Sequence, residues 1–277
     1  MMRVAPLLSA IALAGVGCTR ANLASTATTE EGNVTPPPDP PAIALPAASA
    51  EPDGPFFRSS PDAGPSAILR DDAPNLRYAG MGRDACIAEL RRRGIRFVAA
   101  PATRDVLAPI WLRGPLQGVS IHSGFTAKQR LTSSAEIFDC RLVLAVDDFA
   151  SLLAEHGVVE VIHLSAYRSR KDRGCTPKYV GKQHCAALAV DVGTFRKKDG
   201  TVLSVEKDFH GKVGLATCTS GAHPTPATPA AVELWELVCE SAKRALFHVI
   251  LTPNYNVAHK NHLHLEITPD ASWMLIK

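Results

Sequence analysis

Six cysteines beyond residue 80 constrain the fold of this chain more than any other feature. No two of them form a C-x-x-C pair, so their spacing does not predict a zinc site built from thiolates. An even number of cysteines in an exported chain instead predicts a framework of disulfides. Six cysteines permit fifteen connectivities, and we expect pairing in chain order: Cys86 with Cys140, Cys175 with Cys185, and Cys218 with Cys239.

The N-terminus indicates that the chain is exported. Arg3 precedes an apolar stretch of about 14 residues, which is too short to cross a bilayer as a mature helix but suits a signal peptide. The stretch ends in Gly15-Val16-Gly17-Cys18, which is similar to a bacterial lipobox except that Gly15 stands where leucine is usual. We therefore expect residues 1–18 to be a lipoprotein signal peptide with Cys18 as the lipidated residue. The protein would be anchored to a membrane, in the periplasm or at the outer-membrane face. The alternative is secretion with Cys18 removed or unmodified.

Composition divides the rest of the chain in two. Residues 19–75 are rich in Pro, Ala, Ser, Thr and Gly, and such a segment buries too little apolar surface to offset the entropy of ordering it. We expect a disordered tether there and one domain over residues 76–277. The formal net charge is only +3, and no run of Lys and Arg marks a basic groove, which argues against nucleic acid as a partner.

Hydrophobic periodicity within the domain predicts an α+β fold. Helical spacing is found at residues 84–93, 141–156 and 230–245, and the last of these helices has five candidate core positions: Val232, Leu234, Trp235, Val238 and Cys239. Strands are predicted at residues 95–99, 158–167, 189–195, 201–205, 247–251 and 262–267, with a hairpin turn at Asp199-Gly200. This order favours a small antiparallel sheet flanked by helices and stapled by disulfides.

Histidines and one aspartate form the strongest chemical signal. Zinc takes imidazole and carboxylate ligands, and a catalytic site uses three protein ligands and leaves a fourth position for water. Asp191 lies within an apolar strand, where an unpaired carboxylate would be costly to bury. Because residues two apart in a strand share a face, His262, His264 and Glu266 should point the same way. The spacing is also compatible with ordinary surface and core histidines. The candidate ligands for one zinc ion are His184, Asp191 and His264.

Three segments in order resemble known motifs. Ser165-Ala166-Tyr167-Arg168-Ser169 is similar to the S-x-Y-R-S signature of the D-Ala-D-Ala carboxypeptidase and dipeptidase group. The segment from His184 to Asp191 resembles that group's S-x-H-x-x-G-x-A-x-D motif, and His259, His262 and His264 resemble the closing H-x-x-H-x-H of its murein endopeptidase relatives. More narrowly, the stretch from Cys86 to Pro269 resembles the extensin-like C-terminal family. The fold group also contains the hedgehog signalling domain.

The resemblance implies a role for each matching residue. His184, Asp191 and His264 would hold zinc. Arg168 would polarise the scissile carbonyl and stabilise the oxyanion, and His262 would be the general base, with Glu266 as a second candidate. His259, Ser165 and Tyr167 would lie around the ligands or contact substrate. The implied activity is zinc-dependent hydrolysis of amide bonds in peptidoglycan peptides. The alternative is a zinc-containing cell-wall or partner-binding module with little turnover.

The sequence departs from these motifs at three positions. Asn261 stands where related dipeptidases have a Glu base, which favours the endopeptidase-type histidine arrangement. Ala187 replaces the motif's Gly, so the backbone of the turn after His184 is expected to differ slightly. Lys182 replaces its Ser, so any hydroxyl contact there is lost. None of the three removes an implied zinc ligand.

Overall fold

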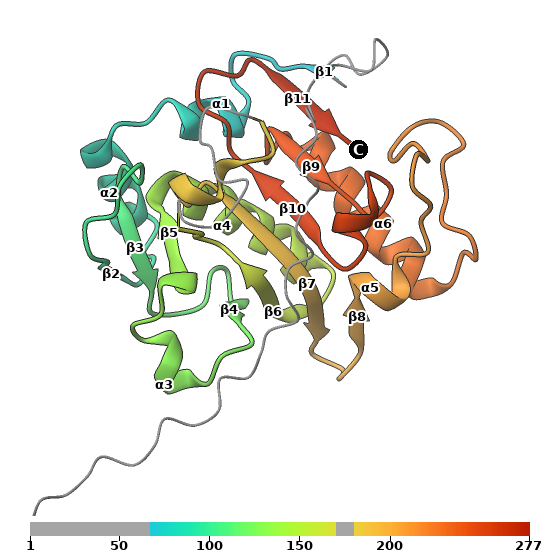
Figure 1. Ribbon diagram of the computed structural model, residues 1–277, viewed down its shortest axis with the longest axis horizontal. Coiled ribbons are helices and arrows are strands. Elements are labelled where there is room, and N and C mark those ends of the chain that lie inside the picture. Colours follow the sequence, from blue (N-terminus) through green and yellow to red (C-terminus); the bar gives the residue numbers. More distant parts are fainter. Residues whose placement is uncertain (1–66, 170–179) are drawn as a thin grey trace, which may run out of the picture. The chain divides into compact units, whose positions relative to one another are not determined.

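The computed structural model describes residues 67–169 and 180–277, which form two β-sheets and the helices around them (Figure 1). The main sheet has the strand order β1-β11-β9-β10-β7-β6-β4, and β8 pairs with β7 in addition. Its strands are β1 (Ala67–Ile68), β4 (Ser120–Ser123), β6 (Val158–Ser165), β7 (Ala189–Lys197), β8 (Val202–Ser204), β9 (Val249–Leu251), β10 (Leu263–Glu266) and β11 (Trp273–Ile276).

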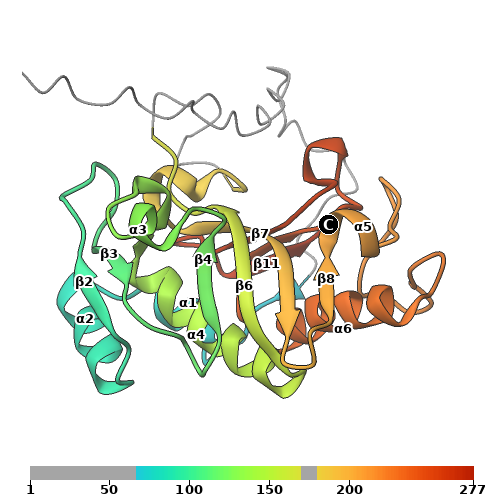
Figure 2. The same cartoon turned by 90° about the horizontal axis from the view of Figure 1, so that it is seen from below.

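Two long helices, α4 and α6, lie on one face of the main sheet (Figure 2). Phe149 of α4 packs edge-on against Phe195 of β7 and against Phe247 before β9. Trp235 of α6 stacks on Phe209 and donates its indole N–H to the Phe209 carbonyl at 2.9 Å. The helices are α1 (Pro74–Ala79), α2 (Arg83–Arg92), α3 (Ala127–Arg130), α4 (Cys140–Glu155), α5 (Val205–Asp208) and α6 (Pro229–Lys243). Three 3-10 turns are η1 (Ser134–Glu136), η2 (Gln183–Ala186) and η3 (Val257–His259).

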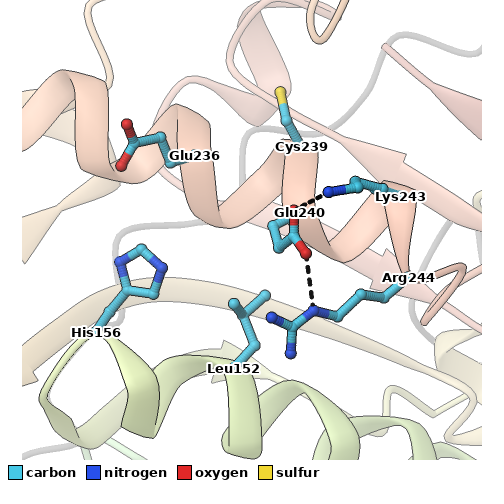
Figure 3. A pocket seen from close by; sticks show the side chains of 7 residues that line it. All are labelled: Leu152, His156, Glu236, Cys239, Glu240, Lys243 and Arg244. Atoms are coloured by element: carbon cyan, nitrogen blue, oxygen red, sulfur yellow. Dashed lines mark hydrogen bonds and ion pairs between the residues drawn. The ribbon is translucent and has the colours of Figure 1, made fainter.

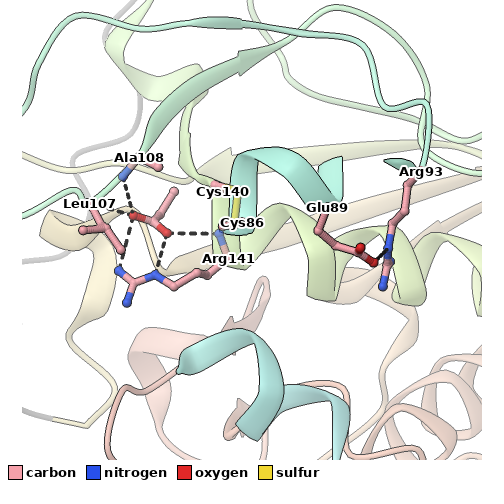
Figure 4. Close-up of a disulfide and its surroundings, with 8 residues drawn as sticks. Cys86, Glu89, Arg93, Leu107, Ala108, Cys140 and Arg141 are labelled. Carbon is pink, nitrogen blue, oxygen red and sulfur yellow. Dashed lines mark hydrogen bonds and ion pairs between the residues drawn. A yellow bond between two sulfur atoms is a disulfide. The ribbon is translucent and has the colours of Figure 1, made fainter. Parts of the chain in front are cut away.

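A small antiparallel sheet leads into α4. It has the order β2-β3-β5, with β2 (Phe97–Ala99), β3 (Pro109–Leu112) and β5 (Ile137–Asp139). Asp139 is fully buried and caps α4, because its carboxylate accepts a hydrogen bond from the Arg141 backbone N–H at 3.0 Å. It also accepts hydrogen bonds from the backbone N–H groups of Leu107 and Ala108, which come just before β3 (Figure 4 labels the three donor residues). This carboxylate therefore fixes the start of α4 against the small sheet.

Two of the three predicted disulfides are confirmed. Cys86–Cys140 joins α2 to α4, and Cys218–Cys239 joins a loop to α6 (Figure 4 shows the first). With a sequence separation of 54 between its cysteines, the first bond is worth about 4 kcal/mol in a chain-entropy model. Cys175, half of the third predicted pair, lies outside the described residues. Disulfides of this kind are typical of oxidising compartments outside the cytosol.

The predicted α+β class is confirmed, and the predicted helices and strands lie within a few residues of the observed ones. The main sheet, however, is not the small antiparallel sheet that the sequence predicts. The main sheet is larger than predicted and is mixed, because β4 runs parallel to β6 and β9 runs parallel to β11. The missed strands β1, β3, β4, β5 and β11 are at most four residues long and show little periodicity. The prediction that Val232 belongs to the core is wrong, because this residue is 37% exposed. Leu234, Trp235 and Val238 are buried, as predicted.

Two features bear on the expected organisation of the chain. Strand β1 pairs with β11, so ordered pairing begins before residue 76, in the last part of the segment whose composition predicts a tether. Among the described residues, no helix has the length and apolarity that crossing a membrane requires.

Candidate metal centre

Three buried side chains converge on one point between η2, β7 and β10. His184 Nε2 lies 3.1 Å from Asp191 Oδ1, His264 Nδ1 lies 3.0 Å from the same oxygen, and the two nitrogens are 3.2 Å apart. Ligands about 2.0–2.1 Å from a tetrahedral zinc ion are separated by about 3.3 Å. The three atoms therefore already form a triangle of the size that one zinc ion requires, and the predicted grouping of these residues is confirmed.

Two adjacent β-bulges aim Asp191 at this point. Ile162 pairs with Thr194 and the next residue, His163, pairs with Val192, so Gly193 is an extra residue on β7. Beyond it Ser165 pairs with Asp191, which makes Leu164 the extra residue on β6. The extra residue shifts the alternation of side chains. Phe195 therefore faces the helices, while Asp191, four residues earlier, faces away from them.

Hydrogen bonds on the far side of each imidazole select the nitrogen that faces Asp191. His184 Nδ1 donates to the Ala166 carbonyl at 2.6 Å, which leaves Nε2 as the lone-pair nitrogen. His264 Nε2 donates to Glu266 Oε2 at 3.0 Å, which leaves Nδ1. Metal-binding histidines usually donate their other N–H to a carboxylate or a carbonyl in this way. Each ring therefore turns towards Asp191 the nitrogen that a metal ion would bind.

Glu266 is fully buried and accepts four hydrogen bonds. Besides the His264 imidazole, its carboxylate accepts from the backbone N–H groups of Gly181 and Gln183 and from the Thr268 hydroxyl, at 3.0, 3.3 and 2.7 Å. The predicted common face of His264 and Glu266 is thus confirmed. The carboxylate lies behind His264 as seen from Asp191, because it binds the opposite nitrogen of the ring.

The second oxygen of Asp191 is bound by Ser165 and Arg168. Ser165 donates its hydroxyl to Oδ2 at 2.9 Å, and the Arg168 guanidinium donates to the same oxygen while its Nε donates to Ser165 Oγ at 3.0 Å. Burial would raise the pKa of Asp191, but electrostatic interactions with His184, His262 and Arg168 hold it well below its usual range. Asp191 is therefore an ionised carboxylate. Arg168 is 40% exposed and marks the side of the centre nearest to solvent.

His262 lies beside the centre with one nitrogen fixed. Its Nδ1 donates to the Asn261 side-chain oxygen at 2.8 Å, so Nε2 is the nitrogen that faces Asp191 Oδ1, at 3.5 Å. The ring of His259 lies 5.0 Å from that of His262 and 6.0 Å from that of His264, and Tyr255 packs edge-on against its other side. His259 thus packs beside the cluster, and its side chain hydrogen-bonds to Asn256 and not to Asp191.

The protonation of the histidines follows from their surroundings. Burial lowers the pKa of His184 and lowers that of His259 to about 3, so both rings are neutral. Burial also opposes the charged form of His264, but hydrogen bonds to Asp191 and Glu266 outweigh it and raise its pKa to about 9. A metal ion that bound at Nδ1 would therefore release a proton from His264.

Two other motif residues have structural surroundings. Tyr167 packs against an apolar cluster of Val106, Ile137 and Ala187. Ala187 has a φ of +52° directly after η2, so it adopts the left-handed backbone that glycine adopts most readily. No sequence pattern predicted the Ala166 carbonyl as a partner of His184. Asn261, noted only as the absence of a Glu, is the residue that orients His262.

Comparison with known proteins assigns the chain to a family. The family model described as the extensin-like protein C-terminus matches residues 84–276. The chain belongs to this family. The match covers most of the described structure and includes all three residues of the metal centre, which confirms the resemblance to the extensin-like proteins. No curated protein and no solved structure matches the chain, so the relation to the D-Ala-D-Ala peptidases and to the hedgehog domain stays a prediction.

Proposed function

We propose that this extensin-like domain is a zinc-dependent hydrolase of amide bonds in peptidoglycan peptides. The ligand set carries the proposal. Two imidazole nitrogens and one ionised carboxylate oxygen lie within 3.0–3.2 Å of one another. Three such protein ligands with a fourth position left for water are typical of catalytic zinc sites, whereas structural sites are closed by four, often thiolates. Neither Cys86–Cys140 nor Cys218–Cys239 involves a residue of the cluster.

A bound zinc ion would polarise the amide carbonyl as a Lewis acid and would lower the pKa of its bound water towards neutrality. His262 would then accept a proton through Nε2 and later deliver it to the leaving amine. The bond from Nδ1 to Asn261 fits this task, because it holds the ring in the tautomer whose Nε2 has a lone pair. A histidine base of this kind takes the place of the Glu that Asn261 replaces.

Arg168 would stabilise negative charge on the carbonyl oxygen as the amide is attacked. Its side chain is anchored by Asp191 and Ser165 and is 40% exposed, so it can contact both a ligand and the substrate. A cation held in place before the reaction needs little reorganisation when charge develops. Ser165 would thus orient Arg168 and Asp191, while His259 would pack against His262.

Glu266 would orient His264 and would not act as the base. It is fully buried, and both of its oxygens already accept hydrogen bonds, from His264, from Thr268 and from two backbone N–H groups. A carboxylate in this position raises the basicity of the imidazole and fixes its tautomer. Of the two candidate bases that the sequence suggests, His262 is the one whose geometry favours the role.

The setting of the reaction is the cell envelope. We propose that residues 1–18 direct export, that Cys18 receives a lipid, and that residues 19–75 give the domain reach from a membrane to the wall. The disulfides support an oxidising compartment. Peptidoglycan peptide is the substrate that the motif resemblance favours.

A zinc-containing binding module with little turnover is the second candidate. One observation favours it: the guanidinium that would stabilise the oxyanion already donates to Asp191 and Ser165. If those bonds persisted with substrate bound, Arg168 would neutralise the metal ligand and contribute little to the transition state.

The deciding experiment measures metal first and turnover second. Zinc in the purified domain should reach about one ion per chain by elemental analysis, and His264→Ala should reduce it strongly. The zinc-loaded protein is then incubated with purified peptidoglycan, and the released peptides are identified by mass spectrometry. New products that require zinc and Arg168 support the hydrolase. Zinc binding without any product supports the binding module, and absence of zinc binding contradicts both.

A further inference from the structure

A depression in the surface lies between α5, the loop after it and the segment that contains η3. We call it the α5 groove. Its wall on the α5 side includes Lys207 and Val213, and its wall on the η3 side includes Val257 and Lys260. Val257 is 72% exposed and Val213 is 51% exposed, so apolar side chains face solvent on both walls.

The walls of the α5 groove are held together by Asn254. Its buried side-chain oxygen accepts a hydrogen bond from the Lys212 backbone N–H at 2.7 Å, and its backbone carbonyl accepts one from the Gly214 N–H at 2.8 Å. Its amide donates to Thr217 at 2.9 Å. Gly211 is required here, because a Cβ on it would lie 2.0 Å from Asn254 Oδ1. The groove is therefore preformed, since the loop on one wall is bonded to the segment on the other.

The charges of the α5 groove are unbalanced. Lys207 and Lys260 are exposed and make no ion pair with any described residue, and Glu206 is the one acidic residue in the lining. The depression between α4 and α6 is a contrast (Figure 3). There Lys243 and Arg244 both bind Glu240, so the basic groups are already neutralised.

The segment that contains η3 contributes both to the α5 groove and to the surroundings of the metal centre. Val257 begins η3 and His259 ends it, and the His259 ring lies 5.0 Å from the ring of His262. Lys260 is the next residue and precedes His262 by two positions. A chain whose amide lay at His262 would therefore have the groove beside it, on the segment that contains η3.

We infer that the α5 groove is a subsite for a carboxylate-bearing peptide segment that flanks the amide at the metal centre. Two unpaired ammonium groups match free carboxylates, and the exposed valines match the methyl groups of alanine-rich stem peptides. The inference rests on the proposed function, because it takes the substrate of that centre to be an anionic wall peptide.

The test measures binding of the intact zinc-loaded protein to purified peptidoglycan by co-sedimentation, a readout that needs no turnover. The variant is Lys207→Gln with Lys260→Gln. The matched control, Lys198→Gln with Lys243→Gln, removes the same charge outside the groove. We expect the groove variant to bind about 5- to 10-fold more weakly, because two exposed charge contacts are lost, and the control to bind as wild type. Melting temperature and zinc content should be the same in all three proteins.

A second arm identifies the ligand chemistry. Soluble peptidoglycan peptides with free carboxylates should compete with wild-type binding, and the same peptides with amidated carboxylates should compete several-fold less. The inference is overturned if wild type does not sediment with peptidoglycan, if the groove variant and the control bind equally, or if amidation has no effect. Failure of the hydrolase proposal is distinct: the groove-dependent binding persists, but no peptide is released by wild type.

Discussion

Glu266→Gln tests whether the carboxylate behind His264 tunes the metal centre. The wild-type carboxylate accepts four hydrogen bonds, including that of His264 Nε2 at 3.0 Å. An amide has one acceptor oxygen, so its NH2 group must face two donors in either orientation. If it faces His264, the ring is driven towards the tautomer whose Nδ1 bears hydrogen and cannot bind metal. Loss of such a partner typically reduces metal affinity about 10- to 100-fold, or about 1.4–2.7 kcal/mol.

The same substitution should destabilise the metal-free protein. Two buried donors lose their acceptor, which costs on the order of 3 kcal/mol and corresponds to a melting temperature roughly 10 °C lower. Zinc affinity is measured by competition with a chromophoric chelator at fixed pH, and stability by thermal denaturation without metal. Thr268→Val is the matched control, because it removes one donor to Glu266 and leaves the bond to His264. It should cost about 1 kcal/mol of stability and change zinc affinity less than about threefold. Wild-type zinc affinity in Glu266→Gln would refute the orienting role.

Four further outcomes are expected. His264→Ala should abolish stoichiometric zinc by elemental analysis while His259→Ala retains it, and equal loss in both would contradict the ligand assignment. Arg168→Ala should lower kcat for peptidoglycan peptides about 10²- to 10³-fold with zinc retained, and unchanged kcat would remove its transition-state role. Burial lowers the pKa of His248 to about 4. The unfolded chain therefore binds this proton first, and the free energy of unfolding should fall by at most about 3 kcal/mol between pH 6.5 and 4. This fall should shrink in His248→Gln, and an identical pH profile would exclude His248 as its source. Ala187→Gly should stabilise the protein by about 1 kcal/mol in denaturant unfolding, since Ala187 has a φ of +52°, and a destabilised variant would show that its buried methyl group matters more.

Local sequence signals determined much of this protein. The alternation and periodicity of apolar residues located α4, α6, β6 and β7 to within a few residues, because each is long enough to show its period. Glycines marked the ends of elements where left-handed backbone is required, as at Gly157 after α4. The ligand types were also readable, because a carboxylate at Asp191 within an apolar strand needs a partner.

The tertiary structure alone decided the sheet and the direction in which Asp191 points. Short strands such as β4 and β11 are recruited by pairing with long ones, and their parallel alignment depends on contacts far apart in the chain. Strict alternation from Phe195 would bury Asp191 under the helices, and the bulge at Gly193 reverses this. Such a bulge depends on the register of two strands, which no local pattern encodes. The hydrogen bond that selects the ligand nitrogen of His184 likewise joins residues 18 positions apart, His184 and Ala166. The sequence thus determined which side chains can bind a metal, and the packing of the sheet determined that they meet.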